Sequence, residues 1–253
     1  MKLSVCIDAV FMGKDIEQAI GMVKKAEIQA VEFWTWEDKD IHKLKKAAEE
    51  NGIEISAFCT DFISLVDETK REDYLEALKR TIDTAKSLGC KMIISQTGAE
   101  MSCPRNIQHA NLVEGLKSCV PLLEDNGMTL VIEPLNIRVD HKGYYLSSSD
   151  EAAEIIKEVG SDHVKMLYDI YHQQITEGDL IRRIKEYLPY IGHFHAAGNP
   201  GRHELYYSEI DYKAIMDAIK ETDYDGYIGL EYFPLDEPEK GLSYAKRVVE
   251  CKG

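Results

Sequence analysis

Eight short runs of apolar and β-branched residues recur along the chain, and their spacing limits the folds that the sequence can adopt. Successive runs begin about 23 to 38 residues apart, which is too far for the hairpin-linked strands of an all-β protein. The stretches between them carry apolar residues at helical spacing, as in Tyr74–Leu88 and Leu112–Leu123. We expect the runs to form strands at Leu3–Ile7, Ala30–Trp34, Ile53–Phe58, Cys90–Ser95, Met128–Glu133, Val164–Asp169, Tyr190–Ala196 and Tyr227–Tyr232.

Strand and helix alternating in this way are typical of parallel βαβ units. A closed barrel of eight such units needs about 250 residues, and the chain has 253. An open, doubly wound sheet is the alternative, but the first strand–helix junction, Asp8–Lys14, lacks a GxGxxG phosphate turn. No proline-rich or serine-rich linker divides the chain. The sequence therefore predicts an α/β fold, a single (β/α)₈ TIM barrel that forms one domain over residues 1–253.

Glycines mark the predicted helix ends. A glycine directly after a helix is the usual C-terminal signal, because it adopts the left-handed conformation without a steric penalty. Glycines stand in this position, just before the next predicted strand, at Gly52, Gly89, Gly127, Gly160 and Gly226.

The net charge of −15 restricts the partners of the protein. An acidic surface repels phosphate backbones, and lysines alternate with glutamates rather than forming a basic face, so nucleic acid is not an expected partner. No apolar run reaches the length of about 18 residues that indicates a membrane span, and the N-terminus lacks the features of a signal peptide. The six cysteines show no paired spacing. We expect a cytoplasmic protein that acts on a small molecule.

Four consecutive predicted strands end in side chains that can bind a metal. In a parallel barrel, reactive residues lie where strands end and βα loops begin. Three carboxylates that converge there would repel one another, and a divalent cation would relieve the repulsion. Oxygen-rich ligation with one imidazole suits Mg²⁺, Mn²⁺ or Co²⁺ better than a structural zinc. The predicted ligands are Glu133, Asp169, His195 and Glu231.

Each of these residues also has a simpler interpretation. Asp169 alone could be a helix N-cap, and His193 points to the same side of its strand as His195. We take His195 as the ligand because it lies nearer the end of the strand. Trp34 and Trp36 could line the pocket or pack in the core, and we leave both out of the predicted site.

Two further polar residues are expected to contact the substrate. His172 follows Asp169 by three residues, within reach of a group bound to the metal. Arg202 lies in the glycine-containing loop after the seventh strand, and its guanidinium suits a carboxylate or a sugar hydroxyl.

Four motifs in the second half of the chain resemble the hydroxypyruvate isomerase family, within the xylose isomerase-like barrels that also include the ketose 3-epimerases. They are Ile132–Asn136, Tyr168–His172, Asn199–Glu204 and Gly229–Tyr232. Two positions differ: the isomerases tend to carry glutamine at the position of His195, where the ketose 3-epimerases carry histidine, and Leu205–Glu209 replaces a glycine-containing loop.

The resemblance implies an isomerase that moves a proton between adjacent carbons through a cis-enediolate, with a divalent metal holding substrate oxygens. Glu133 and Glu231 would serve as base and acid, and His172 and Arg202 would orient the substrate. The expected reaction interconverts hydroxypyruvate and tartronate semialdehyde; the alternative is a ketose 3-epimerase of the tagatose or psicose type, which returns the proton to the same carbon. A non-catalytic sugar-binding barrel and an abasic-site endonuclease are weaker alternatives, and the acidity of the chain argues against the endonuclease. By analogy with the relatives, a homo-oligomer is a further expectation.

Overall fold

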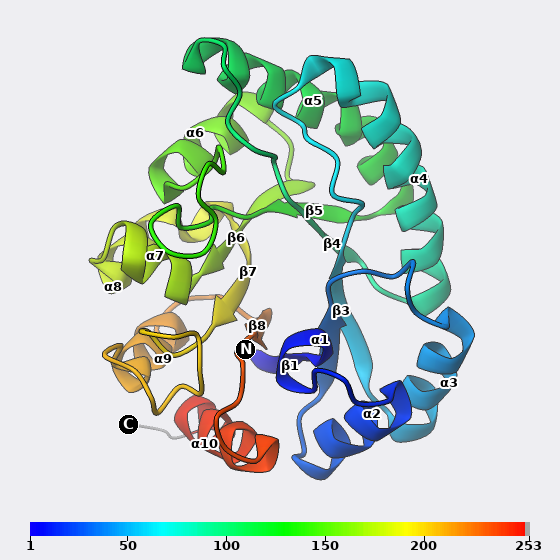
Figure 1. Ribbon diagram of the computed structural model, residues 1–253, viewed down its shortest axis with the longest axis vertical. Coiled ribbons are helices and arrows are strands. Elements are labelled where there is room, and N and C mark those ends of the chain that lie inside the picture. Colours follow the sequence, from blue (N-terminus) through cyan, green and yellow to red (C-terminus); the bar gives the residue numbers. More distant parts are fainter. Residues whose placement is uncertain (251–253) are drawn as a thin grey trace.

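Eight parallel strands close into a barrel in the order in which they occur along the chain (Figure 1). The computed structural model describes residues 1–250, and in it β8 pairs with β1 and so closes the ring. The strands are β1 (Lys2–Cys6), β2 (Ala30–Phe33), β3 (Glu54–Cys59), β4 (Met92–Ser95), β5 (Thr129–Ile132), β6 (Val164–Asp169), β7 (Ile191–Ala196) and β8 (Tyr227–Leu230). Each predicted strand overlaps one of these, so the (β/α)₈ barrel is confirmed.

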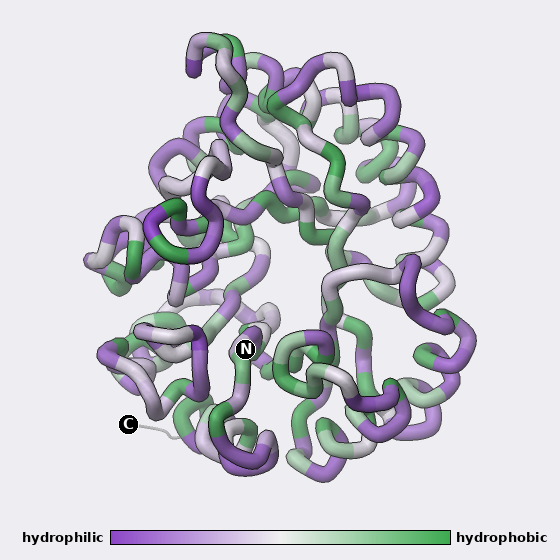
Figure 2. Tube along the Cα trace, in the orientation of Figure 1, coloured by the Kyte–Doolittle hydropathy of each residue, from purple (hydrophilic) through white to green (hydrophobic). Residues whose placement is uncertain are grey.

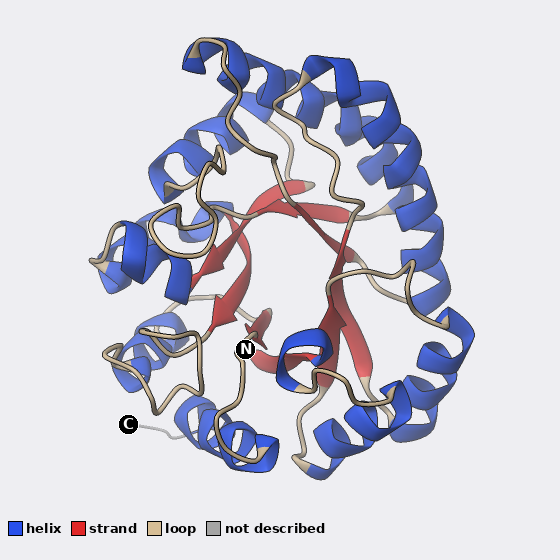
Figure 3. Ribbon diagram, viewed as in Figure 1, coloured by secondary structure: helices blue, strands red, loops and turns tan. Residues whose placement is uncertain are grey.

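Helices surround the barrel, as Figure 3 shows. They are α1 (Ile7–Val10), α2 (Ile16–Lys25), α3 (Ile41–Asn51), α4 (Arg71–Leu88), α5 (Arg105–Asn126), α6 (Ser149–Val159), α7 (Ile170–Thr176), α8 (Leu180–Tyr187), α9 (Tyr212–Lys220) and α10 (Pro238–Glu250), with 3₁₀ turns at η1 (Glu68–Lys70) and η2 (Leu188–Tyr190). Within residues 1–250, no helix is both long enough and apolar enough to cross a membrane.

Four of the five predicted helix-end glycines are confirmed. They cap α3, α4, α5 and α6 with φ between 61° and 72°, in the left-handed region that favours glycine, at Gly52, Gly89, Gly127 and Gly160.

The prediction for Gly226 is wrong. Helix α9 ends at Lys220, and its cap residue Glu221 keeps a right-handed conformation. The Thr222 hydroxyl donates to the Ile219 carbonyl (2.6 Å), so a side chain satisfies the end of this helix and no left-handed glycine is needed there.

Alternation along the strands separates two apolar layers. In β6, Met166 and Tyr168 belong to the large core between the barrel and the helices, whereas Leu167 packs inside the barrel. The interior cluster is made of Ala57, Cys59, Ile94, Val131 and Leu167, and Figure 2 shows the apolar character of the strands. Because side chains alternate with a period of two, the residues two positions after Val131 and Leu167, Glu133 and Asp169, also face the barrel interior.

Candidate active site

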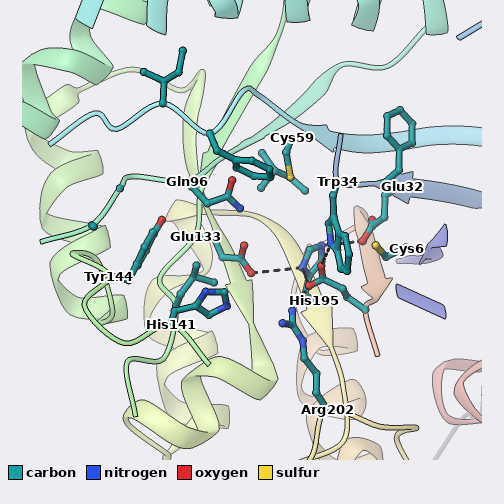
Figure 4. Close-up of a pocket in the computed structure, with 18 of the residues that line it drawn as sticks. Cys6, Glu32, Trp34, Cys59, Gln96, Glu133, His141, Tyr144, His195 and Arg202 are labelled. Carbon is teal, nitrogen blue, oxygen red and sulfur yellow. Dashed lines mark hydrogen bonds and ion pairs between the residues drawn. The ribbon is translucent and has the colours of Figure 1, made fainter. Parts of the chain in front are cut away.

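The four predicted metal ligands meet at the carboxyl end of the barrel. Glu133 follows β5, Asp169 ends β6, His195 lies in β7 and Glu231 follows β8. One ligand atom from each lies within 4.8 Å of the ligand atoms of the other three, and the residues are between 0% and 5% exposed. Figure 4 shows Glu133 and His195 turned toward each other, with a dashed line marking their ion pair.

Asp169 combines both interpretations that the sequence left open. Its Oδ1 accepts hydrogen bonds from the backbone N–H groups of Tyr171 (2.8 Å) and His172 (3.3 Å), and so caps α7. Its Oδ2 is buried and has no hydrogen-bond partner among residues 1–250. One oxygen therefore anchors the helix while the other remains available to the site.

His195 lies between the carboxylates, and His193 lies deeper in the barrel. The Nδ1 atom of His195 is 3.1 Å from Glu231 Oε2 and 3.7 Å from Glu133 Oε1. The Nε2 atom of each histidine contacts the Glu32 carboxylate. The structure therefore brings His195, rather than His193, into the four-residue cluster.

The two glutamates have different surroundings. Glu231 accepts hydrogen bonds from the Trp34 indole and the Arg202 guanidinium and is paired with His195. Glu133 Oε1 is buried without a hydrogen-bond partner in the described chain. Burial raises the pKa of Glu231, but the positive charges of Arg202 and His195 outweigh it and hold the pKa well below its usual range. Glu231 is therefore a stabilised carboxylate, and Glu133 is the less constrained of the two.

The cluster disfavours a third negative charge when no cation is bound. Burial raises the pKa of Asp169, the Arg202 charge opposes that rise, and Glu133 and Glu231 add to it, so that the pKa is about 7.

Arg202 is held in place by the loops that follow β7 and β8. Its carbonyl accepts from the Phe233 N–H (2.8 Å), and the buried Glu204 carboxylate accepts from two N–H groups of the β8 loop. At Gly198, where this loop begins, a Cβ atom would lie 2.5 Å from the Glu204 carbonyl oxygen, so the turn requires glycine. Arg202 Nη2 thereby lies 3.7 Å from Asp169 Oδ2, as well as bonding to Glu231.

His172 lies behind Asp169 and is fully buried. Its Nδ1 is 2.6 Å from the Asn136 side-chain nitrogen, which can only donate, so Nδ1 is the acceptor and the proton of the neutral ring is on Nε2. That Nε2 atom is 3.6 Å from Asp169 Oδ2 and lacks a hydrogen-bond partner among the described residues. Burial and the Arg202 charge hold the pKa of His172 well below its usual range, which keeps the ring neutral. Its predicted contact with the substrate stays a prediction.

A cavity of about 540 Å³ opens above the cluster. Glu133, His195 and Arg202, which Figure 4 labels, line it together with Glu231. The remaining wall is largely apolar and includes Trp34, Phe62, Ile63, Leu135 and Phe233.

Three residues of the site were absent from the prediction. Trp34 donates to Glu231, Glu32 contacts His195, and His141 lines the cavity. Glu32 and Trp34 are two residues apart, so the alternation that placed His193 and His195 on one side of their strand could also have placed this pair inside the barrel. His141 lies in the loop after β5, and nothing in its local sequence indicated its position.

The donors of the cluster fit a divalent metal ion. They comprise three carboxylates and one imidazole, and Glu133 Oε1, Asp169 Oδ2 and His195 Nδ1 are buried polar atoms for which residues 1–250 provide no hydrogen bond. Such atoms are costly unless a ligand satisfies them.

Comparison with known proteins identifies the family of the chain. Residues 20–249 match the model of the xylose isomerase-like TIM barrel family. Hydroxypyruvate isomerase from Escherichia coli (strain K12) is 34% identical over 178 residues, which cover 69% of this chain and 68% of that protein.

Two solved structures share the fold. An AP endonuclease of family 2 from Brucella melitensis has a TM-score of 0.92 at 22% identity, with 97% of this chain and 98% of that chain covered. D-psicose 3-epimerase from Clostridium cellulolyticum H10, solved with D-tagatose, has a TM-score of 0.82 at 20% identity, with 99% and 100% covered. At these identities the likeness shows the fold alone. With its family match and its curated relative taken together, the chain belongs to the xylose isomerase-like TIM barrel family and is an isomerase.

Proposed function

We propose that the protein is a divalent-metal-dependent isomerase that interconverts hydroxypyruvate and tartronate semialdehyde. The observation that carries the proposal is the buried cluster of Glu133, Asp169, His195 and Glu231, with Arg202 beside it. The cluster offers two glutamates for proton transfer, and the Arg202 guanidinium offers a positive charge that can pair with a substrate carboxylate. The relative from Escherichia coli supports this choice of substrate.

Glu133, Asp169, His195 and Glu231 would hold the ion, and their oxygen-rich donor set favours Mg²⁺ or Mn²⁺ and also accepts Co²⁺. When bound, the ion would supply positive charge beside the carbonyl and hydroxyl oxygens of the substrate and stabilise the negative charge that develops on them.

Glu133 is placed to act as the base, because its Oε1 receives no hydrogen bond within the described chain. It would remove a proton from the carbon next to the carbonyl, and the C–H electron pair would form the double bond of an enediolate. A substrate carboxylate would compete with Glu231 for Arg202. Without Arg202 as its partner, the released Glu231 oxygen would take up a proton from water and deliver it to the neighbouring carbon, while the hydroxyl proton of the substrate moves to the former carbonyl oxygen. Glu133 would return the proton it removed to water, so that both glutamates end the turnover ionised.

Isotope exchange tests the proposal. In D₂O with Mn²⁺, we expect product formed from hydroxypyruvate to carry deuterium on the carbon that received the proton, as measured by NMR or mass spectrometry. Chelation with EDTA should lower the rate by about 100-fold or more, because the charge on the enediolate would lose its stabilisation. A reaction insensitive to EDTA, or the absence of any reaction with added metal, would contradict the proposal.

A ketose 3-epimerase is the second candidate, and the size of the cavity favours it. A volume of about 540 Å³ is more than a small acid such as hydroxypyruvate fills, and it lies within the range of about 300–1,000 Å³ for small-molecule sites. A Mn²⁺-supplemented comparison of hydroxypyruvate with free ketoses, with the products identified, separates the two. We expect kcat/KM for hydroxypyruvate to exceed that for any ketose by about tenfold or more, because a charge-assisted bond from Arg202 to a carboxylate is stronger than its hydrogen bond to a sugar hydroxyl. The reverse order would assign the protein to the epimerases.

A further inference from the structure

A further buried carboxylate, that of Glu32, lies beside the proposed metal site, inside the barrel. Glu32 in β2 is 1% exposed and reaches across the barrel to β7. Its Oε1 is 2.9 Å from His195 Nε2, and its Oε2 is 3.0 Å from His193 Nε2. Figure 4 shows Glu32 and His195 turned toward each other. The His193 contact is a hydrogen bond, whereas the His195 contact is an ion pair at hydrogen-bond distance. Glu32 Oε1 and His195 Nε2 are both buried and have no hydrogen-bond partner among residues 1–250, so each is the nearest polar group available to the other.

Two histidines are the ion-pair partners of the buried Glu32 carboxylate within residues 1–250. The Ser56 hydroxyl adds a longer hydrogen bond (3.3 Å). A buried charge of this kind is costly unless it is paired. The two imidazoles are therefore the principal partners of the Glu32 carboxylate.

The fold also leaves space for this pair at one position. Gly229 in β8 is in register with His195 in β7. A Cβ atom at Gly229 would lie 2.1 Å from Glu32 Oε1 and 2.7 Å from His195 Cδ2. Any side chain at this position would push the carboxylate and the imidazole apart, so the contact depends on the glycine.

We propose that Glu32 is a positioning residue that fixes the tautomer and orientation of His195. When the proposed ion replaces the Nδ1 proton of His195, Glu32 would keep the remaining proton on Nε2 and so leave the Nδ1 lone pair directed toward the ion between Glu133 and Glu231. Metal-binding histidines generally donate their second ring N–H to a carboxylate or carbonyl, and loss of that partner costs about 10–100-fold in metal affinity. The inference rests on the proposed metal-dependent function.

Metal affinity provides the first test. We expect Glu32→Gln to weaken Mn²⁺ binding by about 10–100-fold in calorimetric titration, because an amide cannot accept from both imidazoles. The matched control is Ser56→Ala, which removes another contact of Glu32 but keeps the carboxylate, and it should bind Mn²⁺ within about threefold of the wild type. Wild-type affinity in Glu32→Gln would overturn the inference.

The tautomer can be measured in the unaltered protein, so the test does not depend on how well Glu32→Gln folds. In the Mg²⁺-loaded, ¹⁵N-histidine-labelled protein, we expect His195 to carry its proton on Nε2 and a metal-perturbed resonance at Nδ1. A proton on Nδ1 would overturn the inference. Failure of the wild type to bind Mn²⁺ or Mg²⁺ would instead contradict the proposed function, so the two failures are distinguishable.

Discussion

Replacing Glu133 with glutamine is expected to lower kcat by about 10²–10⁴-fold, the usual contribution of a general base, while the barrel remains folded. Glutamine has the same shape, and Glu133 Oε1 forms no hydrogen bond with residues 1–250 that the substitution would break. The variant loses the group that accepts the proton and one negative charge of the proposed metal site. Turnover of hydroxypyruvate at saturating Mn²⁺ measures the loss of the base separately from weaker metal binding, and circular dichroism checks the fold.

Two further variants test whether the loss of activity comes from the Glu133 carboxylate itself. Glu133→Asp keeps the charge on a shorter side chain and should retain more activity than Glu133→Gln, because a carboxylate can still accept a proton. Glu54→Gln is the control. Glu54 begins β3 at the opposite end of the barrel, where its exposed carboxylate contacts Lys2 and Tyr227. This control should be as active as the wild type. Near-normal activity in Glu133→Gln would contradict the role of Glu133.

The barrel and the four converging side chains could be predicted because both follow from the order and spacing of residues along the chain. Strand position follows from the spacing of the apolar runs, and the direction of a side chain follows from its place in the alternation. Glu133, Asp169 and Glu231 each stand at or just after a strand end. In a parallel barrel, that position places them at the same mouth.

Contacts across the barrel could not be predicted in the same way. Glu32 and His193 are separated by 161 residues, and Trp34 and Glu231 by 197. Whether such pairs touch depends on the diameter of the barrel and on small residues such as Gly229.

The position of Arg202 likewise depends on the path of two loops. Its contact with Glu231 requires the β7 loop to be tied to the β8 loop through Glu204. Loop conformation is set by such tertiary contacts more than by local sequence. For this reason the sequence could indicate that Arg202 lies near the site but not that it pairs with one glutamate in preference to the other.

Asp169→Asn is expected to have opposite effects on metal binding and on the stability of the metal-free protein. The amide oxygen can replace Oδ1 as the cap of α7, because asparagine is as good an N-cap as aspartate. The group that changes is Oδ2, which faces the cluster without a hydrogen-bond partner in the described structure. Loss of one of the three proposed carboxylate ligands should weaken Mn²⁺ binding by about 100-fold or more in calorimetric titration.

The pH dependence of unfolding follows from the same carboxylate. With a folded-state pKa of about 7 against about 3.9 in an unfolded chain, Asp169 binds its proton more tightly in the folded protein. Its contribution therefore makes the metal-free protein less stable as the pH rises from about 4 to about 7, with the full cost present above pH 7. The uncharged amide of the Asp169→Asn variant would carry no such cost. In EDTA at pH 8, the variant should be more stable than the wild type by about 1–3 kcal/mol in urea unfolding, and the difference should shrink at pH 5.

Added Mn²⁺ should reverse this order, because an ion that binds only the folded state stabilises the wild type and leaves the variant almost unchanged. Asp211→Asn is the matched control. Asp211 caps α9 by accepting from the Ala214 N–H (3.0 Å), so this variant loses a charge at a helix cap outside the site. It should keep wild-type Mn²⁺ affinity and lie within about 0.5 kcal/mol of wild-type stability. If metal-free Asp169→Asn is no more stable than the wild type at pH 8, the three carboxylates do not repel one another as described. If Mn²⁺ stabilises both proteins equally, Asp169 is not a ligand, and the ion binds elsewhere.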